Sequence, residues 1–318
     1  MKFIVISSCS ERKFKKPVPE LMARSLSKGS MSEVAHKWQG LIASSEPRYK
    51  AEDLYCGRSM REVHLSVESL KADLWIASAG LGLISSGTEI PAYSLTTAGN
   101  GLDSIRLKID RDNWSPSGWW GHVKSMGVGI SSLSKLLGKR KQALCLMALP
   151  KAYASLMMDD FLGLNPKQRS RIRLFGMSLA SVMPAEFHRY IMPYDDRLDG
   201  PNSSCPGTRS DFAARALRHF SGLLQEGKAG GTDSADDQKT VRKSLKGWGR
   251  PNIPKRTTKT DPEIQALIVT HWQTVSGQST RMLRYLRDDL QVACEQGRFR
   301  QLFNDIAKNQ RNLSGRIL

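Results

Sequence analysis

Long apolar runs are missing from the sequence. No stretch of its 318 residues approaches the ~20 apolar residues that a membrane-spanning helix needs. The apolar run at 3–6 is too short for a signal peptide, and charged residues follow it at 11–13. We therefore expect a protein of the reducing cytoplasm that makes no contact with a membrane.

Cysteine is scarce, and its spacing argues against two kinds of site. The five cysteines lie far apart without a CxxC pair, so a disulfide framework and a structural zinc site are not expected. The six histidines have no metal-ligand spacing. Walker A, HExxH and GxSxG motifs and a complete dinucleotide fingerprint are also absent. We expect no cofactor and no metal.

Acidic residues are too few to balance the basic ones. The chain has 48 lysines and arginines against 30 acidic residues, a net charge of +18 and a pI of about 9.9. Such a surplus attracts polyanions over long distances but says little about the fold. It predicts a nucleic acid as partner, although a protein that merely carries many lysines is the plainer alternative.

Short buried strands alternate with helical segments along the first two thirds of the chain. This alternation predicts an α/β fold, a mixed or largely parallel sheet flanked by helices, with a basic helical module at the C-terminus. The predicted strands are 2–8, 72–79, 143–149 and 171–175, and the predicted helices between them are 21–45, 60–69 and 151–162.

Three regions follow from composition. Residues 1–225 form the expected α/β domain, 226–260 a Gly/Ser/Asp-rich linker with a basic irregular segment, and 261–318 a module of three helices. Residues 239–318 hold 16 basic and 6 acidic residues, which is +10 of the net charge. We expect this module to contact nucleic acid, rather than to cap the sheet with a solvated basic face. The expected phosphate-binding residues are Arg281, Arg284, Arg287, Arg298 and Arg300.

Chemistry is expected at the carboxyl ends of the strands, where open α/β sheets bind ligands. Cys9 follows the first strand and is the candidate nucleophile, because Arg12 and Lys13 nearby favour a thiolate. Glu11 and Lys13 are the candidate proton-transfer groups. The alternative is that Cys9 is a small residue packed at a strand end.

Two further clusters are candidates for substrate binding. In 192–220, carboxylates and arginines alternate; the carboxylates could accept hydrogen bonds from a guanine-like base or bind a divalent metal, or the segment could be a salt-bridged loop. The other cluster combines an acidic residue, two tyrosines and a glycine that lets a backbone approach a ligand. The candidates are Asp195, Asp199, Arg209 and Asp211 in the first cluster, and Asp53, Tyr55, Gly80 and Tyr93 in the second.

Four short motifs, in this order, resemble the YaaA-like family, named for a bacterial peroxide-stress protein. They are Ser-Cys-Ser-x-x-Lys at 8–13, Ala-x-Asp-Leu-Tyr at 51–55, Ser-Ala-Gly-x-Gly-Leu at 78–83 and Pro-x-Tyr at 91–93. Within that superfamily the chain looks most like the DpdC-type proteins of bacterial 7-deazaguanine DNA-modification systems. The best-known YaaA proteins lack the cysteine at the first strand's end, so a catalytic Cys9 would belong to this branch alone.

The resemblance implies an enzyme that hydrates the nitrile of 7-cyano-7-deazaguanine in DNA to the amide, after flipping the base out of the duplex. It implies DNA as partner, together with other proteins of a DNA-modification system. Two alternatives stay open. One is a non-catalytic DNA-binding protein, and the other is a metal-dependent nuclease that uses Asp195, Asp196 and Asp211.

Overall fold

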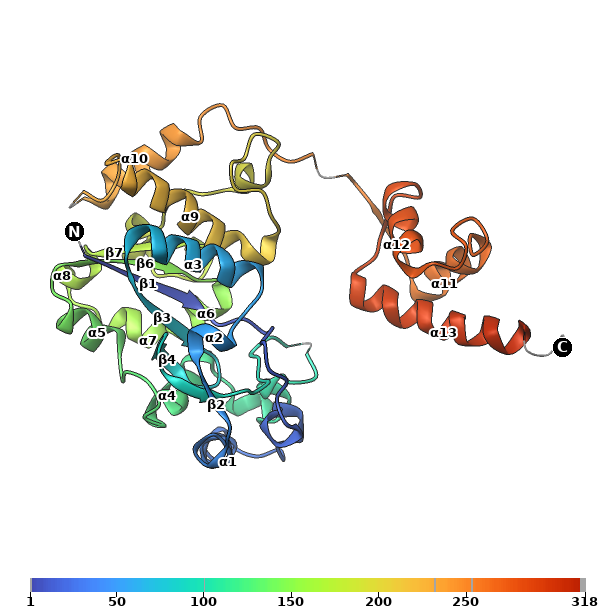
Figure 1. The fold of residues 1–318 in the computed structure, drawn as a ribbon, viewed down its shortest axis with the longest axis horizontal. Coiled ribbons are helices and arrows are strands. Elements are labelled where there is room, and N and C mark those ends of the chain that lie inside the picture. Colours follow the sequence, from blue (N-terminus) through green and yellow to red (C-terminus); the bar gives the residue numbers. More distant parts are fainter. Residues whose placement is uncertain (1, 100, 232, 253, 315–318) are drawn as a thin grey trace. The chain divides into compact units, whose positions relative to one another are not determined.

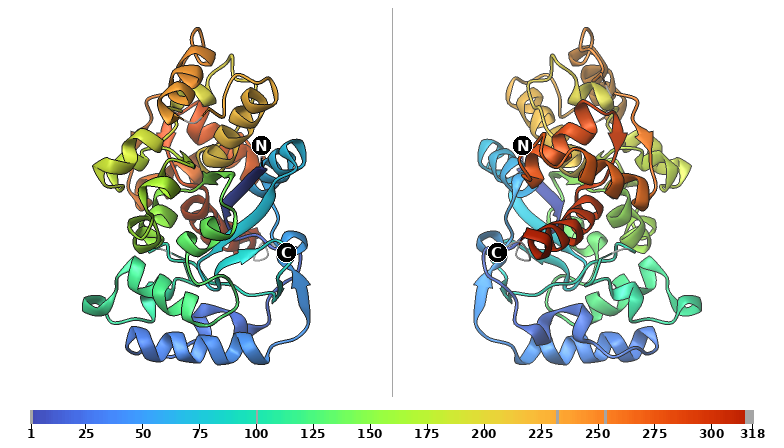
Figure 2. Two further views of the ribbon diagram at one scale, coloured as in Figure 1. Left: turned by 90° about the vertical axis from the view of Figure 1, so that its left-hand side faces the viewer. Right: turned by 90° about the vertical axis from the view of Figure 1, so that its right-hand side faces the viewer.

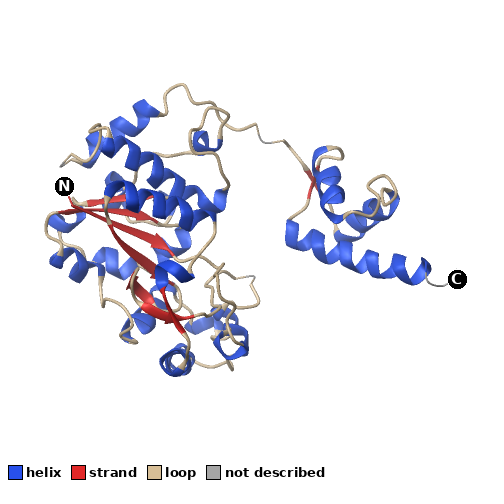
Figure 3. Ribbon diagram, in the orientation of Figure 1, coloured by secondary structure: helices blue, strands red, loops and turns tan. Residues whose placement is uncertain are grey.

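The structure is a computed structural model that describes residues 2–99, 101–231, 233–252 and 254–314. The chain separates into two compact units, Met1–Pro251 and Asn252–Leu318, called unit 1 and unit 2 below. Figure 1 shows the chain coloured along its sequence, and Figure 3 shows that the main sheet belongs to unit 1. Among the described residues, no helix is both long and apolar enough to cross a membrane.

Unit 1 has an α/β fold, which confirms the predicted fold class. Its main sheet has five strands in the order β4-β3-β1-β6-β7. All of them run parallel except β4, which pairs antiparallel with β3 at one edge. The strands are β1 (Lys2–Ser8), β3 (Asp73–Ser78), β4 (Gly82–Ser85), β6 (Ala143–Ala148) and β7 (Ile172–Phe175). Both faces of β6 are buried, as expected for a strand inside a parallel sheet.

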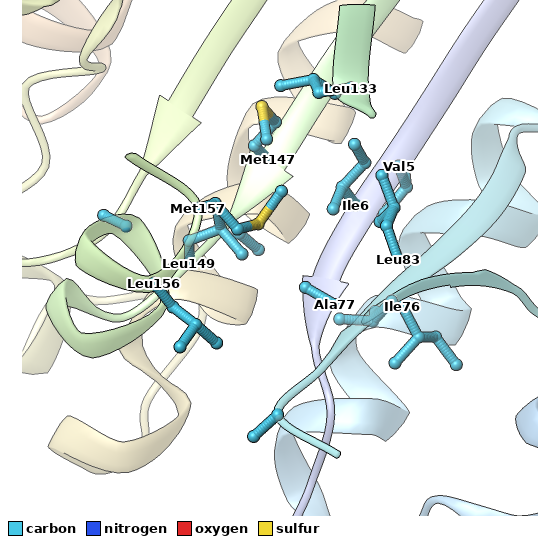
Figure 4. Packing of buried hydrophobic residues seen from close by; sticks show 14 of the residues in the cluster. Val5, Ile6, Ile76, Ala77, Leu83, Leu133, Met147, Leu149, Leu156 and Met157 are labelled. Carbon is cyan, nitrogen blue, oxygen red and sulfur yellow. The ribbon is translucent and has the colours of Figure 1, made fainter. Parts of the chain in front are cut away.

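Helices cover both faces of this sheet. Figure 1 shows α3 (Arg58–Leu70) and α9 (Phe212–Gln225) together on one face, and α4 (Pro116–Ser125), α5 (Leu133–Lys139) and α7 (Met158–Leu162) on the other. Figure 4 shows side chains of β1, β3 and β6 packed with those that follow β6. The strands therefore form the centre of one hydrophobic core.

The first predicted helix, 21–45, is shorter in the structure. The helix α1 spans Met31–Ser44, and two short 3-10 turns precede it at Pro19–Leu21 and Ala23–Ser25. Ser30 fixes the start of α1, because its side chain and that of Glu33 form a capping box. Both views in Figure 2 show α1, drawn in blue, at one end of unit 1.

The other α-helices and strands of unit 1 flank these layers. They are β2 (Arg48–Lys50), α2 (Ala51–Leu54), β5 (Glu89–Pro91), α6 (Lys151–Leu156), α8 (Pro166–Arg169) and α10 (Ser234–Ser244), with β2 and β5 forming a separate antiparallel pair.

The predicted linker at 226–260 needs correction, because its first part belongs to the α/β unit. Residues up to Pro251 are assigned to unit 1, and Ser234–Ser244 form the helix α10. Asp237 of this helix is buried, and its carboxylate lies 2.6 Å from Nε of the buried Arg173 in β7. Asp233 caps the helix by accepting a hydrogen bond from the Ala235 amide. The residue types that indicate a linker here cap a helix instead.

Unit 2 contains the three predicted helices. They are α11 (Asp261–Thr270), α12 (Ser279–Asp288) and α13 (Gln296–Ser314), and a two-residue parallel pair joins β8 (Thr257–Thr258) to β9 (Val292–Ala293). Ile264, Ile268, Met282, Leu286 and Phe299 are buried in a core of the unit's own. The helical spacing of apolar residues in the sequence thus corresponds to a real packed face.

Candidate functional site

The strand order changes direction between β1 and β6. From β1 the chain continues to β3 on one side, whereas from β6 it continues to β7 on the other. Connections that leave neighbouring parallel strands in opposite directions open a crevice between them, and α/β proteins bind ligands there. Cys9 directly follows β1, and Tyr153 lies in α6, directly after β6.

Cys9 and Tyr153 meet at these strand ends. The Cys9 Sγ and the Tyr153 hydroxyl oxygen are 3.0 Å apart and share a hydrogen bond. The Cys9 amide donates to the Ala77 carbonyl at 2.8 Å, which fixes the backbone beside β3. Burial, and next the neighbouring Cys9, raise the pKa of Tyr153 well above its ordinary value. Tyr153 therefore stays protonated at neutral pH and is able to donate to a thiolate. The sequence interpretation missed Tyr153; its place three residues after Pro150 at a strand end was the available signal.

Backbone pairing places Lys13 in the same region. The Phe14 amide donates to the Leu54 carbonyl at 3.0 Å, and the Cys56 amide donates to the Arg12 carbonyl at 3.1 Å. This pairing sets Lys13 opposite Tyr55.

The surroundings of the Lys13 ammonium are largely aromatic. Its Nζ lies 4.5 Å from the ring centre of Tyr93 and 5.4 Å from that of Tyr55, a cation–π arrangement. Burial lowers the pKa of Lys13, and the opposing effects of Cys9 and Glu11 are smaller. A lysine with a lowered pKa exchanges its proton more readily near neutral pH.

A buried chain of hydroxyl groups supports the two rings under Lys13. The Tyr93 hydroxyl lies 2.6 Å from that of Tyr55 and 2.6 Å from the Ser78 Oγ. Gly80 is needed for packing, since a Cβ there would lie 3.0 Å from the Tyr93 ring and 3.3 Å from the Trp38 indole nitrogen. The structure thus brings together Tyr55, Tyr93 and Gly80 of the predicted binding residues, with Lys13 above the rings.

Two tryptophans hold the backbone that follows β3. The Trp38 indole donates to the Gly80 carbonyl and the Trp119 indole donates to the Ala79 carbonyl, each at 2.8 Å. Both indoles are buried. The turn after β3 is therefore fixed from two sides.

Lys13 lines two cavities. The smaller one, about 170 Å³, also has Glu11, Arg24 and Asp103 in its wall. The larger one, about 1040 Å³, is called the basic cavity below. Its wall comprises Arg12, Lys13, Phe14, Glu52, Tyr55, Cys56, Gly57, Arg58, Met60, Arg61, Glu62, His64, Ser204, Cys205, Pro206 and Arg218. Cys9 is half-buried and lines neither cavity, so a ligand that enters either one meets the ammonium of Lys13 first.

Asp103 is a buried carboxylate of the smaller cavity that the sequence interpretation did not single out. Arg24 donates to it from Nε at 2.8 Å and from Nη2 at 2.5 Å, and the Ser94 hydroxyl donates at 2.7 Å. Burial by itself raises the pKa of Asp103, but the hydrogen bonds from Arg24 and Ser94 outweigh it and lower the pKa to about 2. Asp103 thus remains ionised and fixes the Arg24 guanidinium in the cavity wall.

We expect Asp103→Asn to lower the free energy of unfolding by about 1–2 kcal/mol at neutral pH, allowing for the exposure of Arg24. The folded-state pKa of Asp103, about 2, lies below the ordinary 3.8, so its contribution to the free energy of unfolding is fully present at pH values above the ordinary pKa. It is lost as the pH falls through the interval between the two. Urea unfolding from about pH 7 to about pH 3 measures the difference, which should shrink with acidification. Asp110→Asn, at an exposed carboxylate, is the control; a difference for Asp103→Asn that is constant with pH would contradict the assignment.

The carboxylates of 192–220 are engaged by arginines. Asp199 and Asp211 both bind the buried Arg215, at 2.5 and 2.6 Å, and Asp211 also lies 3.0 Å from Nε of Arg58. Asp195 pairs with Arg197 at 2.8 Å. These contacts match the salt-bridged-loop alternative. Among the described residues, no hydrogen bond joins these carboxylates to Cys9, although 204–206 of the same segment line the basic cavity.

Three other predicted residues lie at the surface. Asp53 on α2, Glu11 after β1 and Arg209 are exposed. Glu11 lines the smaller cavity, but Asp53 lines neither of the two. Asp196 lies 3.4 Å from Arg250. Within the part of the chain that the structure describes, no three His, Cys, Asp or Glu side chains come together as metal ligands.

The five predicted phosphate-binding arginines of unit 2 fall into two groups. Arg287 donates to the Cys294 carbonyl and Arg298 to Asp261, so both hold the unit together. Arg284 is exposed and lies 3.7 Å from Asp288. Arg281 and Arg300 are exposed, and neither belongs to an ion pair among the described residues.

If unit 2 binds DNA, as the sequence predicts, replacement of Arg281 and Arg300 by alanine should weaken that binding equally for all sequences. If each binds one phosphate, the slope of log affinity against log salt falls by about 1 for each. Fluorescence anisotropy over a salt series measures this slope. Lys139→Ala with Lys141→Ala removes the same charge from an exposed site near the amino ends of the strands, and serves as control. An equal effect of both pairs would refute a specific role of unit 2.

Comparisons of the chain with models of protein families, with curated proteins and with solved structures give no match.

Proposed function

We propose that this protein is a DNA-base-modifying enzyme that hydrates the nitrile of 7-cyano-7-deazaguanine to the amide, with Cys9 as nucleophile. The observation that carries the proposal is the 3.0 Å contact of Cys9 with Tyr153 at the carboxyl ends of β1 and β6, with Lys13 four residues further along the chain. A thiol, a hydrogen-bond donor and a lysine of lowered pKa are the groups that thiol addition to a nitrile needs. The resemblance to DpdC-type proteins supplies the substrate.

The reaction balances with water as the only second reactant. The Cys9 Sγ adds to the nitrile carbon, and the thiol proton passes by way of Lys13 to the nitrile nitrogen, which gives a thioimidate. Water then adds to the same carbon, and Glu11 or Lys13 moves one of its protons to the nitrogen, which becomes an amino group. The carbon–sulfur bond breaks as the carbonyl forms, and the amide leaves. Tyr153 stabilises the departing thiolate by a hydrogen bond, and the remaining hydroxyl proton returns to the sulfur.

The net charge of the protein and the lining of the smaller cavity support a nucleic-acid substrate. The net charge of +18 favours a polyanion, and unit 2 presents exposed arginines. The smaller cavity offers Glu11 and the Arg24 guanidinium as polar groups for a base. A base inside a duplex reaches such a cavity only after flipping, which costs a few kcal/mol.

The test is an incubation of the full-length protein with duplex DNA that contains 7-cyano-7-deazaguanine. Digestion to nucleosides and mass spectrometry should show a product heavier by one water. Folded protein that binds this DNA and yields no amide would sink the enzyme proposal.

One observation favours a second candidate, a non-catalytic DNA-binding protein. Cys9 lines neither of the two cavities that Lys13 lines, and its sulfur already has a partner in Tyr153. In this candidate the same residues shape a binding pocket without covalent chemistry. This candidate requires that the protein binds DNA and that incubation with DNA containing 7-cyano-7-deazaguanine yields no amide.

A further inference from the structure

The basic cavity has the composition of a nucleic-acid groove. Five of its lining residues are arginine or lysine and two are glutamate. Glu62 is neutralised by Arg218 at 2.7 Å, and Arg58 pairs with Asp211 outside the cavity lining. Arg12 and Arg61 are exposed, and no ion pair of either is found in the described part of the chain. The cavity thus keeps a positive charge.

Phe14 is the other unusual group in this wall. Its side chain is 73% exposed, although an aromatic ring of this size gains free energy from burial. The other exposed large apolar residues do not line this cavity. Phe14 is therefore an exposed ring in a cavity wall that also contains Arg12 and Arg61.

Two parts of the chain bring these side chains to the cavity. Arg12 and Phe14 flank Lys13, and backbone pairing of Arg12 and Phe14 with Cys56 and Leu54 sets Lys13 opposite Tyr55. The Lys13 ammonium lies over the rings of Tyr55 and Tyr93, whereas Arg12 and Phe14 are exposed. Arg61 lines the same cavity from α3.

We infer that the basic cavity is a second DNA-binding surface, in which Phe14 fills the place of the flipped base while Arg12 and Arg61 hold the flanking phosphates. Apolar and aromatic side chains inserted at a base step stabilise an unstacked duplex. Guanidinium groups hold phosphates on either side. The inference rests on the proposed function and assigns a role to Arg12 and Phe14, the two exposed neighbours of Lys13.

The experiment uses the full-length protein and a duplex in which 2-aminopurine neighbours the 7-cyano-7-deazaguanine. Base flipping unstacks 2-aminopurine and raises its fluorescence, and anisotropy measures affinity on the same DNA. We expect Phe14→Ala to reduce the fluorescence rise at saturating protein at least about fivefold. We expect Arg12→Ala with Arg61→Ala to lower the slope of log affinity against log salt by about 2 and to keep the rise at saturation.

Leu162→Ala is the matched control, because Leu162 is 48% exposed and does not line the cavity. Phe14 and arginine variants that bind and unstack DNA like the wild type would overturn the inference. This is also the result expected if Phe14 contacts a protein partner instead of DNA. The two proposals fail separately. If Phe14→Ala loses the fluorescence rise but the wild type forms no amide, the nitrile reaction alone is contradicted. If the wild type forms amide but the variants bind and unstack DNA as it does, this surface alone is contradicted.

Discussion

Cys9→Ala should lose amide formation by about 10³-fold or more, while its affinity for DNA stays unchanged. Removal of a covalent nucleophile abolishes the step in which the nitrile carbon is attacked, and the remaining groups supply only binding and proton transfer. Single-turnover assays with excess protein measure the chemical step directly, and anisotropy on the same DNA measures affinity.

The matched control for Cys9→Ala is Cys145→Ala. Cys145 lies inside β6, and burial raises the pKa of its thiol to about 12, so it is no nucleophile. This variant loses some packing in the sheet but should keep its rate.

Tyr153→Phe provides a graded test, because it removes one hydrogen bond from the thiolate and keeps the ring. Its rate of amide formation should fall less than that of Cys9→Ala. Full activity of Cys9→Ala would mean that a group other than Cys9 attacks the nitrile carbon.

Asp237→Ala should lower the free energy of unfolding by about 3–5 kcal/mol. Its partner Arg173 is fully buried in β7, and the substitution leaves that guanidinium without its counter-charge. Asp237 also accepts a hydrogen bond from the Gly230 amide at 2.7 Å, which fixes the chain before α10. Equilibrium unfolding in urea, followed by far-ultraviolet circular dichroism, gives the change.

Asp236→Ala is the control at the neighbouring position. Asp236 is 69% exposed and pairs with the exposed Lys239, so its loss should cost well under about 1 kcal/mol. Replacing Arg173 and Asp237 together by Met and Leu should restore part of the stability, because no buried charge then remains unpaired. Equal midpoints for Asp236→Ala and Asp237→Ala would mean that α10 does not belong to the folded unit.

Local patterns in the sequence predicted β1, β3, β6, β7 and the three helices of unit 2, because these elements depend on neighbours in the chain. The apolar run 3–6 and the all-apolar stretch 143–149 are too short for an ordinary helix and are typical of strands buried inside a sheet. The spacing of Ile264, Ile268 and Met282 likewise indicates helical faces. Such signals do not require knowledge of distant partners. The edge strand β4 and the short pair β2 and β5 were not predicted.

Pairs of distant residues escaped the sequence interpretation. Arg24 meets Asp103, and Cys9 meets Tyr153, across long stretches of chain, and composition carries no information about which arginine meets which carboxylate. The segment 226–239 was misread for a different reason. Gly, Ser and Asp are typical both of linkers and of helix starts, and only the burial of Asp237 separates the two cases.

The central position of β1 has a consequence for synthesis. This strand is made before both of its neighbours in the sheet, β3 on one side and β6 on the other. Until they emerge its backbone has two unpaired edges and an apolar side-chain run, a combination that favours aggregation. The contact between Cys9 and Tyr153 cannot form before α6 has emerged. A nascent chain that ends before Tyr153 therefore holds Cys9 without this partner, and a chaperone that shields β1 should raise the yield of folded protein.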